Sequence, residues 1–241
     1  MQEAPYKIHR IRKQLKIGVT GASHCTLNAI LKFDGPESPH CVYNEQVAVR
    51  LAQTLHIPIA DGVLTTSGDG QAFASLEVAS PGIALPDILK SQIKQAAARY
   101  PEEAAALVAF DILIGNRDRA QNIKASLVTP HMPIFRAFDH SHALLTIEED
   151  PNDSIRRLHS KDLIVKFHPF FGQISRTSLR IWMDRISSAN DIYFEECCRF
   201  GRAFRAVTAS MQEDLSAALV WRKTNLKTIL ASSLAEIAPL L

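Results

Sequence analysis

Cysteine is scarce in this sequence and follows no pattern. The 241 residues include only Cys25, Cys41, Cys197 and Cys198, with no C-x-x-C pair and no spacing of Cys and His that would hold zinc. We therefore expect reduced thiols that pack as small apolar groups, as is usual in a cytoplasmic protein.

Long apolar runs are also missing. No stretch is long enough to span a bilayer, and the first residues do not contain the apolar segment of a secretory leader. A basic amphipathic helix is not evident either, which argues against a membrane substrate. We therefore expect no membrane partner.

The sequence has no excess of either charge. It contains 27 Lys and Arg against 25 Asp and Glu, a net charge of +2 with neutral histidines. This charge is too small to indicate a nucleic-acid partner, and we expect none. What is present is an ordinary globular composition, 46% hydrophobic and 22% charged. The length suits one domain or two small lobes.

The first third of the chain has the pattern of a small β-sheet. Residues 6–11 and 28–33 are predicted strands, and residues 63–66 and 71–78 form a predicted hairpin with a turn at Gly68-Asp69-Gly70. Between the first two strands lies a turn of small residues that contains Gly18, Gly21 and Ser23. Such a turn lets backbone N–H groups approach phosphate oxygens, although most turns of this kind bind nothing.

Lys32 stands in an otherwise apolar strand. A lysine is unfavourable there unless it is paired or its face of the strand is solvated. A helix is predicted for residues 44–55, whose apolar residues recur every fourth position, with Asn44 as its N-cap. Glu45 then lies in the first turn. It is either a helix-start residue favoured by the helix dipole or the partner of Lys32.

The composition changes after residue 80, where an Ala-Ser-Pro-Gly segment breaks the pattern. Helices are predicted for residues 85–94 and 101–114, and they dominate from residue 175 onward. We therefore predict an α+β, bilobal fold. A β-rich lobe with one helix would occupy residues 1–80, and a larger helical lobe residues 81–241.

A polar segment, residues 116–122, follows the apolar helix 101–114. Two short strands are expected after it, near Leu127 and through Phe135, and Asp139 follows the second. Carboxylate and amide side chains at the ends of short elements suit Mg²⁺, and one carboxylate can orient an attacking hydroxyl. The alternative is a polar hairpin whose Asp and Asn residues only satisfy turns.

Taken in order, these motifs resemble those of the HipA-like kinases, which are related to protein kinases and to phosphatidylinositol 3/4-kinases. The segments that carry the resemblance are Leu15-Lys16-Ile17-Gly18-Val19-Thr20-Gly21, Lys32, Asn44-Glu45, Ile57-Pro58, Phe110-Asp111, Asn116-Arg117-Asp118-Arg119 and Phe138-Asp139-His140. The tail around Ala218-Leu-Val-Trp-Arg222 also resembles the closing helices of that group, so that the resemblance covers nearly the whole chain.

The resemblance implies transfer of the γ-phosphoryl group of ATP to a Ser or Thr hydroxyl of a protein. Lys32 would hold the α- and β-phosphates, with Glu45 fixing its ammonium group. Asp118 would orient the acceptor hydroxyl or accept its proton. The turn with Gly18, Gly21 and Ser23 would cover the phosphates.

The resemblance also implies a metal site and a brace. Asp139 and Asn122 would bind Mg²⁺, and Arg119 would pair with Asp111 or another carboxylate to support the loop. The chain departs from the family pattern in two places. The family's His after Asp-Arg is Ala120 here, and the family's Asn five residues after the catalytic Asp is replaced by Ile123, with Asn122 one position earlier.

These departures leave alternatives open. One is a kinase-shaped binding module, a pseudokinase, that transfers no phosphate. Another is a kinase that acts on a lipid or a small alcohol. The sequence identifies neither the protein substrate nor a regulatory protein partner.

Overall fold

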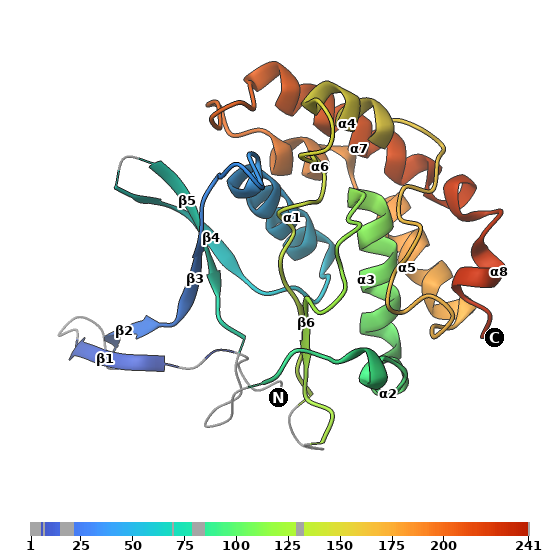
Figure 1. Ribbon diagram of the computed structural model, residues 1–241, viewed down its shortest axis with the longest axis horizontal. Coiled ribbons are helices and arrows are strands. Elements are labelled where there is room, and N and C mark those ends of the chain that lie inside the picture. Colours follow the sequence, from blue (N-terminus) through green and yellow to red (C-terminus); the bar gives the residue numbers. More distant parts are fainter. Residues whose placement is uncertain are drawn as a thin grey trace.

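The protein has an α+β fold, with small antiparallel sheets in the N-terminal part and helices in the C-terminal part (Figure 1). The computed structural model describes residues 6, 8–14, 22–68, 70–78, 85–128 and 133–240. The predicted Gly18 and Gly21, the turn residue Asp69 and the predicted break at 79–82 lie outside the described residues.

In the described residues of the N-terminal part, five strands form two sheets. They are β1 (Ile8–Gln14), β2 (Ser23–Leu27), β3 (Ala29–Lys32), β4 (Gly62–Ser67) and β5 (Gly70–Leu76). β1 pairs with β2, and the second sheet has the order β3-β5-β4. The predicted hairpin is therefore confirmed as β4 and β5. We did not predict β2, whose Ser-His-Cys-Thr-Leu sequence lacks the alternation of a half-buried strand.

The second sheet depends on one close approach of two strands. A Cβ atom at Gly62 would lie 2.2 Å from the ring of Phe73, so the ring can occupy its buried site only because residue 62 lacks a side chain. Phe73 of β5 is the pairing partner of both Lys32 and Leu64. This register places Lys32 at the end of β3.

Helix α1 (Cys41–Leu55) packs against β4 and β5, and its start differs from our prediction. It begins at Cys41, with His40 in the N-cap position, so Asn44 is not the N-cap. Asn44 is fully buried and donates to the backbone carbonyls of Ser141 and Leu145, each at 2.8 Å. Glu45 consequently lies beyond the first turn, which removes its interpretation as a helix-start residue.

The next helices form the centre of the C-terminal part. A 3-10 turn, η1 (Lys90–Gln92), leads into α2 (Ile93–Arg99), so the helix predicted at 85–94 begins and ends about five residues later. Helix α3 (Pro101–Ile114) has the predicted bounds and is buried from Ala104 onward, since it is apolar on all sides. It packs against α2, α5 and α7.

The remaining elements are two short strands and the C-terminal helices. They are β6 (Ile123–Ala125), β7 (Phe135–Ala137), α4 (Pro151–Leu158), α5 (Arg176–Ser188), α6 (Asp191–Cys198), α7 (Ala209–Leu230) and α8 (Leu234–Ile237). β6 comes earlier than the strand predicted near Leu127. The Asp150 side chain caps α4 by accepting from the Asn152 amide. None of the helices in the described part of the chain is long and apolar enough to cross a membrane.

Candidate active site

The loop between α3 and β6, residues 116–122, is fastened to the end of α3 by Asn116. Helix α3 ends at Gly115, which adopts φ 68°, a left-handed conformation that favours glycine. The Asn116 amide donates to Asp111 Oδ1 at 3.1 Å, and its oxygen accepts from the Asp118 backbone N–H at 3.1 Å. The direction in which Asp118 leaves the helix is therefore set by a buried side chain.

Arg119 and Asp111 form a buried ion pair beneath this loop. Arg119 Nε and Nη2 donate to the two carboxylate oxygens of Asp111 at 2.7 and 2.9 Å. Arg119 Nη1 donates to the carbonyls of Phe138 at 2.6 Å and Asn122 at 3.3 Å. Burial would raise the pKa of Asp111, but the guanidinium outweighs it and lowers that pKa. Arg119 thus makes the predicted pair and joins the loop to the chain that follows β7.

His168 is a third member of this buried group. Its Nδ1 accepts from the Phe170 amide at 3.2 Å, so the proton lies on Nε2, which donates to Asp111 Oδ2 at 3.0 Å. Burial lowers the pKa of His168 below its usual 6.5, and the contact with Asp111 only partly opposes this. The imidazole is therefore neutral at pH 7. We did not predict this contact, because 57 residues separate the two side chains.

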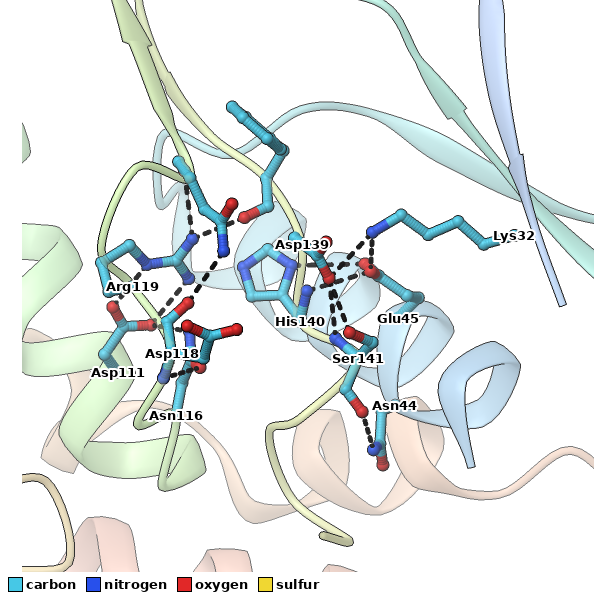
Figure 2. Close-up of polar contacts among 12 residues, drawn as sticks. Lys32, Asn44, Glu45, Asp111, Asn116, Asp118, Arg119, Asp139, His140 and Ser141 are labelled. Atoms are coloured by element: carbon cyan, nitrogen blue, oxygen red, sulfur yellow. Dashed lines mark hydrogen bonds and ion pairs between the residues drawn. The ribbon is translucent and has the colours of Figure 1, made fainter. Parts of the chain in front are cut away.

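A second cluster joins the N-terminal sheet to the segment after β7. Lys32 Nζ lies 2.5 Å from Glu45 Oε1 and 2.9 Å from Asp139 Oδ1 (Figure 2). Glu45 is 2% exposed, and its carboxylate also accepts from the His140 backbone N–H at 3.0 Å. One lysine from β3, one glutamate from α1 and one aspartate from the C-terminal part therefore meet at a single point.

The charges in this cluster stabilise one another. Burial opposes the charged form of each group, yet the pKa of Lys32 is raised by Glu45 and Asp139. The pKa of Glu45 is lowered by His140 and Lys32, and that of Asp139 by Lys32 and Ser141, in each case against the effect of burial. All three side chains are charged at neutral pH.

Asp139 is held in an uncommon backbone conformation. Its φ is 59°, in the left-handed region that non-glycine residues rarely adopt. The Ser141 hydroxyl donates to Asp139 Oδ1 at 2.7 Å, and the Ser141 carbonyl accepts from Asn44. Strain of this kind persists where surrounding contacts fix the chain, as Asn44 and Ser141 do here. The sequence predicts neither contact. It places Asn44 at the helix start, and nothing in it marks Ser141 as a partner of Asp139.

Asp118 and Asn122 lie on the exposed side of the 116–122 loop. Asn122 Nδ2 donates to the Asp118 carbonyl at 2.9 Å, and Gln121 between them adopts φ 67°. The Asn122 carbonyl accepts from the Phe138 amide at 3.0 Å, which places the end of the loop beside the residue that precedes Asp139. The Asp118 side chain is exposed and lines a depression of about 320 Å³.

The structure thus brings together most of the predicted site residues that it describes. The Lys32 ammonium contacts both Glu45 and Asp139 (Figure 2). The adjoining loop contains Asp118 and Asn122. Ser23 is different. It opens β2 on an exposed surface, and in the described part of the chain no hydrogen bond or ion pair joins it to these residues.

The oxygen atoms near Asp139 fit Mg²⁺ when it is shared with phosphates. Asp139 Oδ2 and Asn122 Oδ1 make no hydrogen bond to any other described residue. No group of three or more Asp, Glu, His or Cys side chains that could hold a metal alone occurs among the described residues. Mg²⁺ is usually bound by one or two carboxylates together with substrate phosphates, and the Oδ2 atom of Asp139 offers one such carboxylate oxygen.

Comparison with solved structures identifies the fold. The toxin HipA of Shewanella oneidensis MR-1, from its complex with HipB and operator DNA, matches with a TM-score of 0.56 and 14% identity over 95% of this chain and 67% of HipA. The Helicobacter pylori proinflammatory kinase CtkA matches with a TM-score of 0.60 and 15% identity over 95% of this chain and 97% of CtkA. No protein-family model and no curated protein matches the sequence. The chain therefore has the α+β fold of these kinases, as the motifs had led us to expect.

Proposed function

We propose that this chain is a kinase that transfers the γ-phosphoryl group of ATP to a Ser or Thr hydroxyl of a protein, with Mg²⁺ as cofactor. The observation that carries the proposal is the contact of Lys32 with both Glu45 and Asp139 beside the braced 116–122 loop. A lysine fixed by a buried glutamate, close to a carboxylate with a free oxygen, suits the binding of a magnesium nucleotide.

Each residue has a separate part in the proposed reaction. The Lys32 ammonium binds phosphate oxygens of ATP, and Glu45 keeps it oriented. Asp118 accepts the proton of the acceptor hydroxyl as the new O–P bond forms and the bond from the γ-phosphorus to ADP breaks. Asp139 and Asn122 would hold Mg²⁺, which neutralises charge on the phosphates when bound. Because all four cysteines are free, we place this activity in the cytoplasm.

Asp118→Ala tests the proposal directly. We expect phosphotransfer to fall about 10²- to 10⁴-fold, the usual contribution of a general base, while the melting temperature is unchanged because Asp118 is exposed. The assay follows radiolabelled phosphate from ATP into a panel of Ser- and Thr-containing proteins. Asp214→Ala, which removes an exposed carboxylate on α7, is the matched control. Equal rates for the wild type and Asp118→Ala would refute the role of Asp118.

A non-catalytic binding module is the second candidate, and it is favoured by Ala120 and by the shortened spacing to Asn122. Thermal melting with and without ATP and Mg²⁺ separates the two. A ligand that binds the folded state at about 100 times its Kd stabilises that state by about 2.7 kcal/mol. A catalyst should therefore melt at a higher temperature with millimolar nucleotide. An unchanged melting temperature, together with no transfer, would support the module.

A further inference from the structure

A groove of about 740 Å³ lies beside the 116–122 loop, on the side of Ala120 and Gln121. One wall is the start of α2 with the turn before it, and the other is the segment from residue 166 to residue 173. Arg117 lines both this groove and the depression that contains Asp118. The groove therefore adjoins the residue that we propose to act on the acceptor hydroxyl.

The groove carries an excess of positive charge. Lys90, Lys94 and Lys166 are exposed on its walls, and none of them has an ion-pair partner among the described residues. Glu236 is the only carboxylate among the described residues that line it. Since the whole chain has a net charge of only +2, this concentration of lysine is local.

Phe167 adds an apolar contact surface at the same wall. Its side chain is 87% exposed, although the residue that follows it, His168, is buried. A single exposed phenylalanine on a protein surface needs no explanation. Phe167 differs because the buried residue next to it fixes its position and because unpaired lysines lie beside it. Such a combination suits the binding of a partner that has both acidic and apolar side chains.

The position of this wall relative to Asp118 is fixed by the buried polar group described above. His168 follows Phe167 and donates to Asp111, and Asp111 in turn holds Arg119 of the 116–122 loop. The wall and the loop are thus joined through a chain of buried hydrogen bonds. A partner bound along the wall would be held at a constant distance from the loop.

We propose that this groove binds an acidic segment of the protein that carries the phosphate acceptor. Carboxylates of that segment would face Lys90, Lys94 and Lys166, and an apolar side chain would contact Phe167. The identification of the partner as the substrate rests on the proposed kinase function. A short groove with three lysines and an exposed phenylalanine suits an extended peptide better than a nucleic acid, whose backbone requires a longer basic stripe.

Peptide binding to the full chain tests this inference without relying on catalysis. The probes are two fluorescein-labelled peptides of equal length, each with a central Ser and a Leu, one flanked by Asp and Glu and the other by Lys. We expect fluorescence anisotropy at low salt to show at least about tenfold tighter binding of the acidic peptide, the combined effect of three exposed charge pairs. The difference should shrink as salt is added.

Charge reversal identifies the residues responsible. The variant Lys90→Glu/Lys94→Glu/Lys166→Glu should lose the preference for the acidic peptide, and thermal melting would verify that it is folded. Lys161→Glu reverses one exposed lysine outside the groove and should keep the preference. Equal binding of the two peptides by the wild type would overturn the inference. Loss of the preference in Lys161→Glu would also overturn it. Tighter binding of a DNA duplex than of the acidic peptide through the same lysines would overturn it as well.

Phosphorylation of the same two peptides separates this inference from the proposed function. If the acidic peptide binds through the lysines but neither peptide is phosphorylated, the kinase proposal fails and the acidic docking groove stands. If both peptides are phosphorylated equally and bind equally, the kinase proposal stands and the groove inference fails.

Discussion

Arg119→Met removes the cation of the buried brace beneath the 116–122 loop. Arg119 and Asp111 are 1% and 0% exposed, so neither charge has access to solvent. Methionine keeps much of the aliphatic volume of the arginine but donates no hydrogen bond. Among the described residues, Asn116 and His168 would then be the remaining side-chain donors to Asp111.

The expected loss of unfolding free energy is about 3–5 kcal/mol, as for other buried ion pairs from which one partner is removed. Most of that loss is the penalty of leaving the Asp111 carboxylate buried without a cation. Burial lowers the pKa of His168, Asp111 raises it, and the Arg119 charge lowers it further. Without Arg119, His168 binds a proton more readily and replaces part of the missing charge. The loss should therefore be larger at pH 8 than at pH 6.

Urea unfolding followed by circular dichroism at both pH values measures this effect. Arg119→Met/Asp111→Leu removes both charges, and we expect it to lose less stability than the single variant, because no buried charge remains. Arg117→Met is the matched control, since the Arg117–Glu148 pair is exposed and should contribute less than about 1 kcal/mol. A loss below about 1 kcal/mol for Arg119→Met, equal at both pH values, would refute the buried brace.

Two further changes test other contacts of the site. In Glu45→Gln, the Lys32 ammonium loses its buried anionic partner. We expect kcat/KM for phosphotransfer to fall about 10- to 100-fold, which is the effect of one hydrogen bond between charged groups. An unchanged kcat/KM would mean that Glu45 does not orient Lys32. In His168→Gln, the dependence of stability on pH should weaken. Burial lowers the folded-state pKa of His168 below 6.5, so the unfolded state binds more protons and the wild type loses stability as the pH falls below 6.5. Melting temperatures between pH 7 and pH 5 measure the slope, and equal slopes for wild type and variant would contradict the assignment.

The sequence predicted the elements of the fold where local patterns are strong. Helix α3 has the predicted bounds, because the segment from Ala104 to Ile114 is apolar except for Asp111 and lies between Pro101 and Gly115. The β4–β5 hairpin was equally clear. Prediction was wrong where distant contacts decide a boundary, as at α1, which starts at Cys41 and leaves Asn44 to bind Ser141, 97 residues away.

The candidate site likewise contains residues that the sequence indicates and residues that only the structure reveals. Lys32 was a signal in the sequence because an unpaired lysine is unfavourable in an apolar strand, and the structure supplies Glu45 and Asp139 as its partners. His168 gave no such signal, since a histidine beside a proline is an ordinary turn residue. Its contact with Asp111 exists only because the segment after α4 folds back against α3.

The sequence by itself therefore determined which chemistry the chain can hold: a lysine that needs an anion, a loop rich in oxygen ligands, and a second carboxylate after a short strand. Only the tertiary structure decided which of these groups meet, how the 116–122 loop is braced, and that three lysines gather along one groove. The physical reason is that periodicity and turn propensity act over a few residues, whereas buried charge pairs form between segments that packing of the core brings together.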